Sequence, residues 1–395
     1  MKTARGVFIV LFLAAITIPV VFIDRTSVIS MLERRMLANP PRVHNGGKLD
    51  IKLLEMLPKQ IDTYITDRFA GRSRLIYFMN HVNYFILQKS HDNRLLVGKD
   101  RWLFYIDKGI GDEFANYYKT NLFNSEQMEN FLWTLGLTTA FCRENGIKFV
   151  FLIVPDKCSV YPEKYLSPRP EGPSLADQVM NAMPQDWREN IIFPRDYFIS
   201  KKDEHAQPLY FNNGLHWTKL GVFYAYGLLY DKLKPAFPNL PEIELQFTPY
   251  MDTGEDNYAL WWGIRKFSPV MELLDVKPVD GWEGHYRYIK SENVPLQYNR
   301  KESVDAMRGK YGMITENVDQ SLPTAVVIRD SYFVALEPFT SSLFSKTEYI
   351  WTEPEKRSVD YLAQMPEKPD VLIWEIGERG LQAIPLMPRG HYPTD

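Results

Sequence analysis

The sequence predicts an α/β sandwich built around a mostly parallel sheet. Residues 147–155, IKFVFLIVP, form a continuous apolar run rich in β-branched and aromatic side chains, which is typical of a strand buried on both faces. Three further strand candidates follow, AVVI at 325–328, EYIW at 348–351 and VLIWEI at 371–376. Helical patterns alternate with these strands, and this alternation indicates helices on both sides of one sheet.

Two helices of this alternation can be delimited from the sequence. Asn124 can cap a helix over residues 125–144, with Gln127 as the reciprocal capping partner and Gly146 as the end of the helix. Apolar positions also recur at helical spacing over residues 216–230. The first helix leads directly into the strand at 147–155, which is the order expected of an α/β unit.

The N-terminus predicts a membrane anchor. Lys2 and Arg5 precede an apolar run over residues 7–23, which is near the lower length limit for spanning a bilayer. No small-x-small cleavage site follows the run, so we expect a signal anchor over residues 1–25, with a cleaved signal peptide as the alternative. The rest of the chain would then face the periplasm or the cell exterior.

The remaining chain divides by pattern into two parts. Residues 26–90 are mostly helical and form a predicted lead-in, and residues 91–395 form the predicted α/β domain. Apolar residues alternate on both sides of Gly98, which indicates a hairpin. A stretch at about 236–321, rich in Pro, Gly and Trp, is expected to be an insertion of short strands and loops.

Composition excludes several classes of function. The chain has 395 residues, 45% of them apolar, and a net charge of −3, which argues against a nucleic-acid partner. It contains no HExxH, CxxC or clustered-histidine pattern, so neither a metal site nor a cofactor is expected. The two cysteines, Cys142 and Cys158, could pair in an exported chain, but the sequence leaves their geometry open.

A serine and a histidine are the candidates for catalysis. Ser331 comes three residues after the end of the predicted strand AVVI, and ligands of open α/β sheets bind beyond the carboxyl ends of the strands. A helix starting near Phe333 would supply backbone N–H groups for an oxyanion. His216 could take the serine proton if it lies at the same sheet edge. Read alone, Ser331 could instead simply cap that helix and His216 could be a structural residue.

Five blocks in order give the chain a recognisable family. They are VGKDRWLFY (97–105), VPDKCSVYPEKY (154–165), HWTKLG (216–221), VVIRDSYF (326–333) and PDVLIWEIGERGL (369–381). Together they resemble the alginate O-acetyltransferase family of SGNH-hydrolase-like proteins, which includes the J and X proteins of alginate acetylation. The resemblance runs from about Arg34 to Leu381.

This resemblance implies an SGNH-hydrolase-like α/β/α domain in circularly permuted motif order. It also implies a membrane-anchored or periplasmic enzyme that transfers acetyl groups to hydroxyls of an extracellular polysaccharide. The acetyl donor would be a partner of the membrane-bound O-acyltransferase type. Carried over to this sequence, Ser331 corresponds to the nucleophile and His216 to the base.

The sequence departs from the family pattern at Gly214. The usual Asp-x-His-Trp is Gly-Leu-His-Trp here, and glycine cannot orient an imidazole or stabilise its cation. Another carboxylate could substitute, with the candidates Asp203, Glu204 and Asp330. Alternatively Asn213 could orient His216 through its side-chain oxygen. A third possibility is a catalytically impaired chain that acts as a polysaccharide-binding or assembly subunit.

Four further side chains are candidates for supporting roles. Lys157, Trp217 and Tyr332 are expected to contact substrate, although Lys157 could equally be a solvated lysine. Arg329 could line the cleft or form a structural ion pair. The sequence thus predicts an O-acetyltransferase that works through an acetyl-serine. The alternatives are an impaired binding subunit and a carbohydrate acetylesterase with the same residues.

Overall fold

The computed structural model describes residues 2–23, 36–90, 94–106, 112–252, 271–279, 286–289, 313–351 and 358–387. The chain forms two compact units, one of residues 1–91 with 255–269 and the other of residues 92–254 with 270–395. The predicted domain boundaries stay a prediction. Most of the predicted insertion lies outside the described residues.

The first unit is mostly helical in its described part. Its helices are α1 (Lys2–Val21), α3 (Ile51–Glu55), α4 (Leu57–Arg68), α5 (Arg72–His81) and the π-helical η1 (Val82–Leu87), beside the short pair β1 (His44–Asn45) and β2 (Lys48–Leu49). Asp50 caps α3, because its carboxylate accepts the amides of Lys52 and Leu53 at 2.9 and 3.4 Å. The helical pattern predicted for this region is therefore confirmed.

The apolar N-terminal run forms α1, and its side chains from Val7 to Leu13 are exposed. Over the described residues, no helix combines the length and the apolar composition needed to cross a bilayer. This finding does not support the predicted signal anchor.

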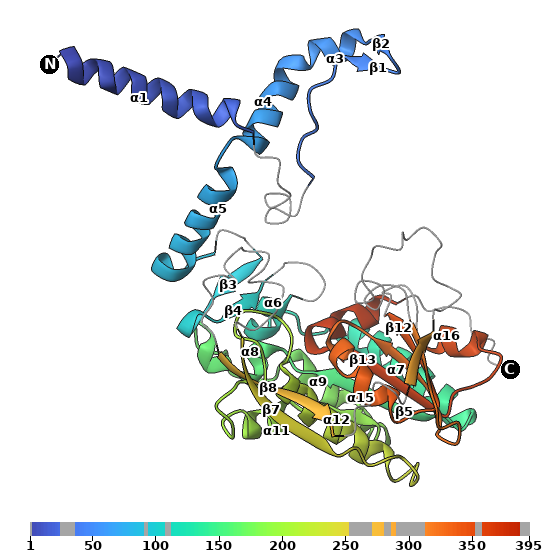
Figure 1. The fold of residues 1–395 in the computed structure, drawn as a ribbon. Helices are drawn as coiled ribbons and strands as arrows, with labels where there is room; N and C mark the ends of the chain where they lie inside the picture. The colour runs from blue at the N-terminus through green and yellow to red at the C-terminus, as the bar shows by residue number, and fades with distance from the viewer. Residues whose placement is uncertain are drawn as a thin grey trace. The chain divides into compact units, whose positions relative to one another are not determined.

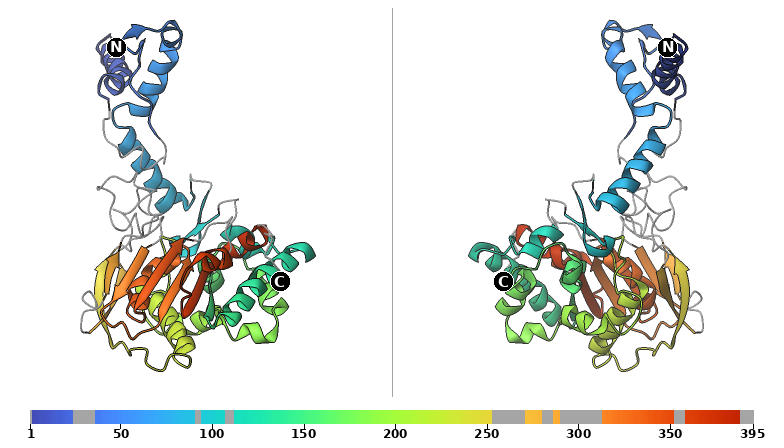
Figure 2. Two further views of the ribbon diagram at one scale, coloured as in Figure 1. Left: turned by 90° about the vertical axis from the view of Figure 1, so that its right-hand side faces the viewer. Right: turned by 90° about the vertical axis from the view of Figure 1, so that its left-hand side faces the viewer.

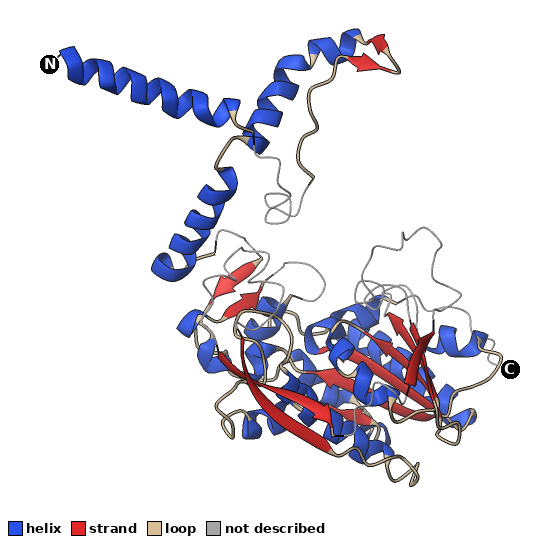
Figure 3. Ribbon diagram, viewed as in Figure 1, coloured by secondary structure: helices blue, strands red, loops and turns tan. Residues whose placement is uncertain are grey.

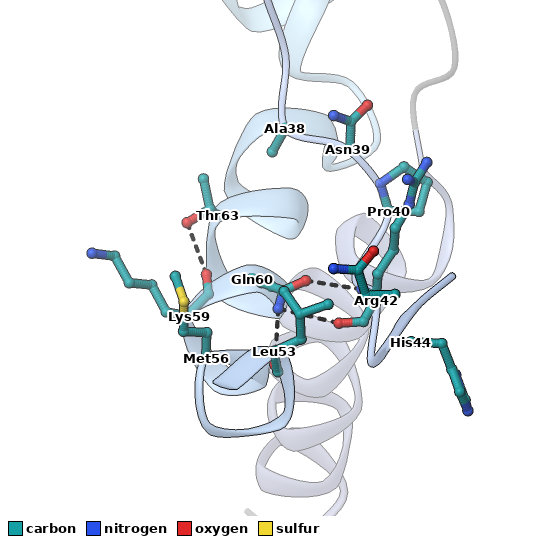
Figure 4. Close-up of a pocket in the computed structure, with 11 residues that line it drawn as sticks. Ala38, Asn39, Pro40, Arg42, His44, Leu53, Met56, Lys59, Gln60 and Thr63 are labelled. Carbon is teal, nitrogen blue, oxygen red and sulfur yellow. Dashed lines mark hydrogen bonds between the residues drawn. The ribbon is translucent and has the colours of Figure 1, made fainter. Parts of the chain in front are cut away.

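A cavity of about 540 Å³ lies in the first unit, between α4 and the segment before β1 (Figure 4). Gln60 closes one side, since its side chain accepts the Arg42 amide at 2.8 Å and donates to the carbonyls of Arg42 and Leu53. Thr63 donates its hydroxyl to the Lys59 carbonyl at 2.8 Å. These polar groups hold the segment onto the helix, so the cavity is a feature of local packing.

The second unit is built on a seven-stranded sheet of order β6-β5-β13-β11-β12-β10-β9. Figure 1 labels β5, β12 and β13 of this sheet. The strands are β5 (Lys148–Val154), β6 (Ile191–Ile192), β9 (Tyr286–Ile289), β10 (Met313–Asn317), β11 (Thr324–Arg329), β12 (Lys346–Trp351) and β13 (Val371–Gly377). Neighbours from β6 to β12 run parallel, whereas β10 is antiparallel to both β12 and β9. The predicted mostly parallel sheet is confirmed, and it gains an antiparallel edge.

Two smaller pairs accompany the sheet, β3 (Leu95–Val97) with β4 (Leu103–Tyr105) and β7 (Leu245–Asp252) with β8 (Met271–Pro278). The first is the predicted hairpin. The α-helices of this unit are α6 (Glu113–Tyr118), α7 (Ser125–Glu144), α8 (Lys157–Val160), α9 (Leu175–Ala182), α10 (Gln185–Arg188), α11 (Arg195–Lys201), α12 (Lys219–Leu233), α15 (Glu337–Ser341) and α16 (Ser358–Gln364). The 3₁₀ turns are η2 (Lys99–Arg101), η3 (Pro162–Lys164), η6 (Tyr332–Ala335) and η7 (Glu378–Leu386).

The central strands bury both faces, as their continuous apolar runs predict. On one face Val150, Val327 and Ile373 join a core that includes residues of α12. On the other face Phe151 and Trp374 pack at 5.0 Å between ring centroids, in a core that includes residues of α7, α9 and α16. Helices therefore cover both sides of the sheet (Figures 2 and 3). The predicted α/β/α layering is confirmed.

The helix before β5 has the predicted cap and bounds. The Gln127 amide donates to Asn124 Oδ1 at 2.9 Å, and the Asn124 amide donates to Gln127 Oε1 at 3.0 Å. Gly146 follows the helix with a φ of +67°, a left-handed conformation that glycine adopts without strain. The chain then turns directly into β5.

The two cysteines are both free and buried. Burial raises the pKa of the Cys142 thiol to about 12 and that of Cys158 well above its usual range. The pairing that the sequence left open is therefore not formed.

A buried ion pair fixes the chain after β11. Arg329 and Glu337 lie 2.6 Å apart with each side chain 1% exposed, and the guanidinium also lies over the Trp351 ring at 5.2 Å. The sequence allowed Arg329 either to line the cleft or to form a structural ion pair, and the structure shows the ion pair. The pair ties the end of β11 to α15, across the turn that carries Ser331.

We expect Glu337→Ala to lower the free energy of unfolding by about 3 kcal/mol, because it removes the carboxylate that pairs with the buried Arg329 guanidinium. Chemical denaturation of the purified chain measures this. Glu204→Gln is the matched control, because Glu204 pairs with Lys201 at the exposed surface and its loss should leave the midpoint unchanged. Equal midpoints for Glu337→Ala and the wild type would contradict the assigned role.

Candidate active site

Ser331 and His216 lie within hydrogen-bond distance of each other. His216 Nε2 and Ser331 Oγ are 2.9 Å apart, although the two residues are 115 positions apart in the sequence. Both side chains are partly buried, so the pair stays open to solvent on one side. An imidazole nitrogen at this distance can accept the hydroxyl proton and make the serine oxygen nucleophilic.

Ser331 lies where the parallel strands end. Asp330 and Ser331 follow β11, and the short 3₁₀ turn η6 begins at Tyr332. This turn is shorter than the expected helix. Its first amide, from Tyr332, donates to Asp330 Oδ1 at 2.8 Å and is therefore already used. The predicted oxyanion site, which relied on N–H groups from Phe333 onward, stays a prediction.

Asp330 joins two neighbouring strand ends. Its Oδ2 accepts the Gly377 amide at the end of β13 at 2.9 Å, and its own amide donates to Glu375 at 2.8 Å. Burial, with Asp330 adding to it, raises the pKa of Glu375 well above its usual range. Asp330 therefore shapes the turn around Ser331, a role that differs from orienting His216.

His216 is carried by a short loop closed at its base. Tyr210 and Trp217 form an antiparallel bridge, and the Phe211 amide donates to the His216 carbonyl at 3.1 Å. The helix α12 begins two residues after Trp217 and packs closely on this loop. A Cβ on Gly221 would lie 2.5 Å from the Leu209 carbonyl oxygen, which explains the glycine in HWTKLG.

Tyr332 and Trp217 link the two halves of the pair. Trp217 Nε1 donates to the Tyr332 carbonyl at 3.0 Å, and the Tyr332 hydroxyl donates to the Leu215 carbonyl at 3.1 Å. The rings of His216 and Tyr332 meet edge to face, with centroids 5.1 Å apart. Trp217 is 2% exposed and Tyr332 1%. Both side chains are thus used inside the fold, and the expected substrate contacts stay predictions.

Lys157 is likewise buried and fully occupied by backbone oxygens. Its ammonium donates to the carbonyls of Phe211 and Asn212 at 3.1 and 3.5 Å, and also to those of Leu103 and Gly214. It is 0% exposed. The solvated alternative is therefore wrong, and the expected substrate contact stays a prediction. Lys157 holds the His216 loop against β4, since one cation binds carbonyls from both.

The groups proposed to replace an aspartate at 214 are dispersed. Glu204 pairs with Lys201 at 2.6 Å at the exposed surface, and Asp203 lines a separate pocket. Asn213 is 1% exposed and lies in the loop that Lys157 binds. Asp330 is used by backbone amides, as described above. The orienting group of His216 stays a prediction.

Buried carboxylates lie behind the site. The Asp156 amide donates to Glu378 at 3.0 Å, Asp156 Oδ2 accepts from Asn116 at 2.7 Å, and Glu113 accepts the Cys158 amide at 3.1 Å. Burial raises the pKa of Asp156 well above its usual range. Across the described part of the chain, no group of three or more His, Cys, Asp and Glu side chains is arranged to hold a metal ion.

Several of these roles have no sequence signal that would have revealed them. Three features depend on loops that meet only in the fold. They are the Lys157 ammonium bound by carbonyls, the hydrogen bonds of Asp330 to two strand ends, and the pocket beside Asp203. One signal was present in the sequence. Trp217 directly follows His216 and Tyr332 directly follows Ser331, and residues at these positions can join the two motifs.

The domain can now be compared with known proteins. Residues 95–253 match the family described as SGNH hydrolase-like domain, acetyltransferase AlgX. The resemblance to the alginate O-acetyltransferase family is confirmed. The AlgX-like match includes His216, whereas Ser331 lies beyond it, so the serine rests on geometry alone. No curated protein sequence matches the chain.

Two solved structures of Bacillus cereus PatB1 share this fold. Bacillus cereus PatB1 with a sulfonyl adduct has a TM-score of 0.52 at 16% identity, covering 74% of this chain and 100% of its own. A second PatB1 structure has a TM-score of 0.50 at 16% identity, covering 73% and 96%. The O-acetyltransferase domain of Pseudomonas putida AlgJ has a TM-score of 0.44 at 17% identity, covering 73% and 92%. At these identities the PatB1 likeness shows the fold.

Proposed function

We propose that the chain is an O-acetyltransferase that acetylates hydroxyls of an extracellular or cell-surface polysaccharide through an acetyl-serine at Ser331. The observation that carries this proposal is the 2.9 Å distance between His216 Nε2 and Ser331 Oγ at the carboxyl end of β11. The AlgX-like match supports the acetyl group as the transferred unit.

The proposed reaction has two matched halves. In the first, His216 Nε2 takes the Ser331 proton as the serine oxygen attacks the acetyl carbonyl carbon, and the imidazolium then protonates the departing donor. In the second, Nε2 takes the proton of a sugar hydroxyl, which attacks the acetyl carbon. The Ser331 oxygen leaves and regains its proton from the imidazolium. An esterase would differ only in using water as acceptor.

The acetyl donor and the location are further parts of the proposal. A partner of the membrane-bound O-acyltransferase type would deliver the acetyl group, and the acceptor would lie in the periplasm or outside the cell. The family resemblance supports this placement. Incubating the purified chain with an aryl acetate and an oligosaccharide tests the proposed transfer reaction. Acetylated sugar indicates a transferase, and free acetate alone indicates an esterase.

A polysaccharide-binding or assembly subunit is the second candidate, and Gly214 is the observation that favours it. If another group already orients His216, Gly214→Asp should change aryl-acetate turnover by less than tenfold. A rise on the order of 10⁴-fold would instead show that the natural chain is impaired, since that is the cost of losing the orienting aspartate in serine proteases. Gly214→Asn is the matched control, with similar size and no charge.

A further inference from the structure

A second pocket lies on the loop that carries the catalytic histidine. It has a volume of about 280 Å³ and belongs wholly to the second unit. The lining residues used here are Trp102, Tyr161, Lys202, Asp203, Gln207 and Asn212. Two aromatic rings and several polar groups thus surround one small space, a composition typical of a site for a small ligand.

Two amide side chains at this pocket each have one hydrogen-bonding atom without a partner among the described residues. Gln207 is 5% exposed, and its Oε1 accepts the Leu274 amide at 2.6 Å. Its buried Nε2 has no hydrogen-bond partner among the described residues, and the same holds for the buried Oδ1 of Asn212. A buried group left in this state costs about 1–3 kcal/mol. The pair offers one donor and one acceptor, which is the pattern that a hydroxyl satisfies.

The charges around the pocket are balanced. Lys202 in the wall pairs with Glu163 at 2.8 Å, and His205 in the wall lies 3.1 Å from the Tyr224 hydroxyl. Asp203 adds a carboxylate to the wall. An anionic sugar would therefore meet a lysine that is already paired and a carboxylate that repels it. The electrostatics favour an uncharged ligand.

The aromatic wall suits a ring with apolar faces. Trp102 and Tyr161 pack with ring centroids 4.6 Å apart. Sugar rings combine apolar faces with hydroxyls at the edge, so they can pack on aromatic side chains while the hydroxyls meet the amides.

The pocket and the catalytic base share one loop. Asn212 precedes His216 by four residues, and a chain of this length spans at most about 14 Å. The Asn212 carbonyl accepts the Leu103 amide at 2.7 Å, so the loop is fixed between the two positions. A glycan chain anchored at the pocket would therefore lie close to His216.

We propose that this pocket binds one uncharged pyranose unit of the acceptor glycan, next to the unit that is acetylated. The inference rests on the proposed function and narrows its substrate class to glycans with neutral sugars at this position. Asn212 and Gln207 recognise hydroxyls, and Trp102 with Tyr161 packs on the ring.

Calorimetric titration of the full chain carrying Ser331→Ala tests the proposal without catalysis. The probes are cellohexaose, which is neutral, and hexamannuronate, which is anionic. We expect cellohexaose to bind and hexamannuronate to bind at least tenfold more weakly. Absence of cellohexaose binding, or equal or tighter binding of hexamannuronate, would overturn the proposal.

Two pocket variants locate the binding. Asn212→Ala removes only the side chain and leaves the carbonyl that holds the loop, and Gln207→Glu keeps an acceptor for the Leu274 amide while removing the donor. Each should weaken cellohexaose binding at least tenfold. Glu367→Gln, at another pocket that Thr324 and Lys346 line at the amino ends of the strands, is the control. Wild-type affinity in both pocket variants contradicts the site.

The outcomes separate this proposal from the proposed function. If Ser331→Ala abolishes aryl-acetate turnover but cellohexaose does not bind, the pocket proposal fails and the catalytic one stands. If cellohexaose binds but Ser331→Ala retains turnover, the catalytic proposal fails and the pocket stands.

Discussion

Replacing Ser331 with alanine is expected to lower kcat/KM for an aryl acetate by a factor on the order of 10⁴ to 10⁶. The alanine has no oxygen to attack the acetyl carbonyl, and losses of this size follow removal of a serine nucleophile. The 2.9 Å distance to His216 is the observation on which we propose this serine as the nucleophile. Steady-state kinetics of the purified chain measures the loss.

The double variant sharpens this test. Ser331 and His216 act as one unit in the proposed mechanism, so His216→Ala alone should cost nearly as much as Ser331→Ala, and the double variant little more than either. Ser200→Ala is the control serine, since its hydroxyl donates to the Tyr197 carbonyl at the surface. Losses that multiply in the double variant would contradict a shared role.

Replacing Lys157 with methionine should have the second largest effect. Methionine leaves the bound carbonyls without their donor, so we expect the free energy of unfolding to fall by about 4 kcal/mol. His216 lies on the freed loop, and a displaced base should lower kcat by about 100-fold. KM for an aryl acetate should change less, because the buried lysine acts through the loop that carries His216.

Two further variants keep the Lys157 prediction testable. Lys157→Gln retains N–H donors and should give intermediate stability and kcat, which distinguishes positioning from mere filling of space. Lys232→Met is the control, because that lysine donates to one carbonyl, of Glu189, and should cost no more than about 1 kcal/mol. A folded Lys157→Met chain with the wild-type kcat would refute the positioning role.

The sequence predicts the sheet well because burial on both faces leaves a direct mark. The continuous apolar runs became β5, β11, β12 and β13, and the cap at Asn124 set the start of α7. The antiparallel edge was not predicted, since the sequence gives no pairing direction. Strand pairing at the edge of a sheet depends on which later segments of the chain fold back against that edge.

The sequence predicted that Ser331 and His216 lie together, and their atoms are 2.9 Å apart, but it did not predict the residues that support them. Ser331 and His216 have chemistry that a motif can reveal. Lys157 and Tyr332 look like cleft residues in sequence, because both follow buried strands. Their burial arises from the loop at 209–217 and the β4 strand, which close over them only in the fold. Exposure is a tertiary property, so residue type alone predicts it poorly at strand ends.

The most direct measurement is mass spectrometry of the chain after brief incubation with an aryl acetate. The account predicts one acetyl group, located by peptide mapping on Ser331, which disappears in Ser331→Ala and is removed when an acceptor oligosaccharide is added. Acetylation of a different residue, or turnover that leaves no acetyl group on Ser331 in the wild-type chain even when it is quenched rapidly, would contradict the acetyl-serine at the centre of the account.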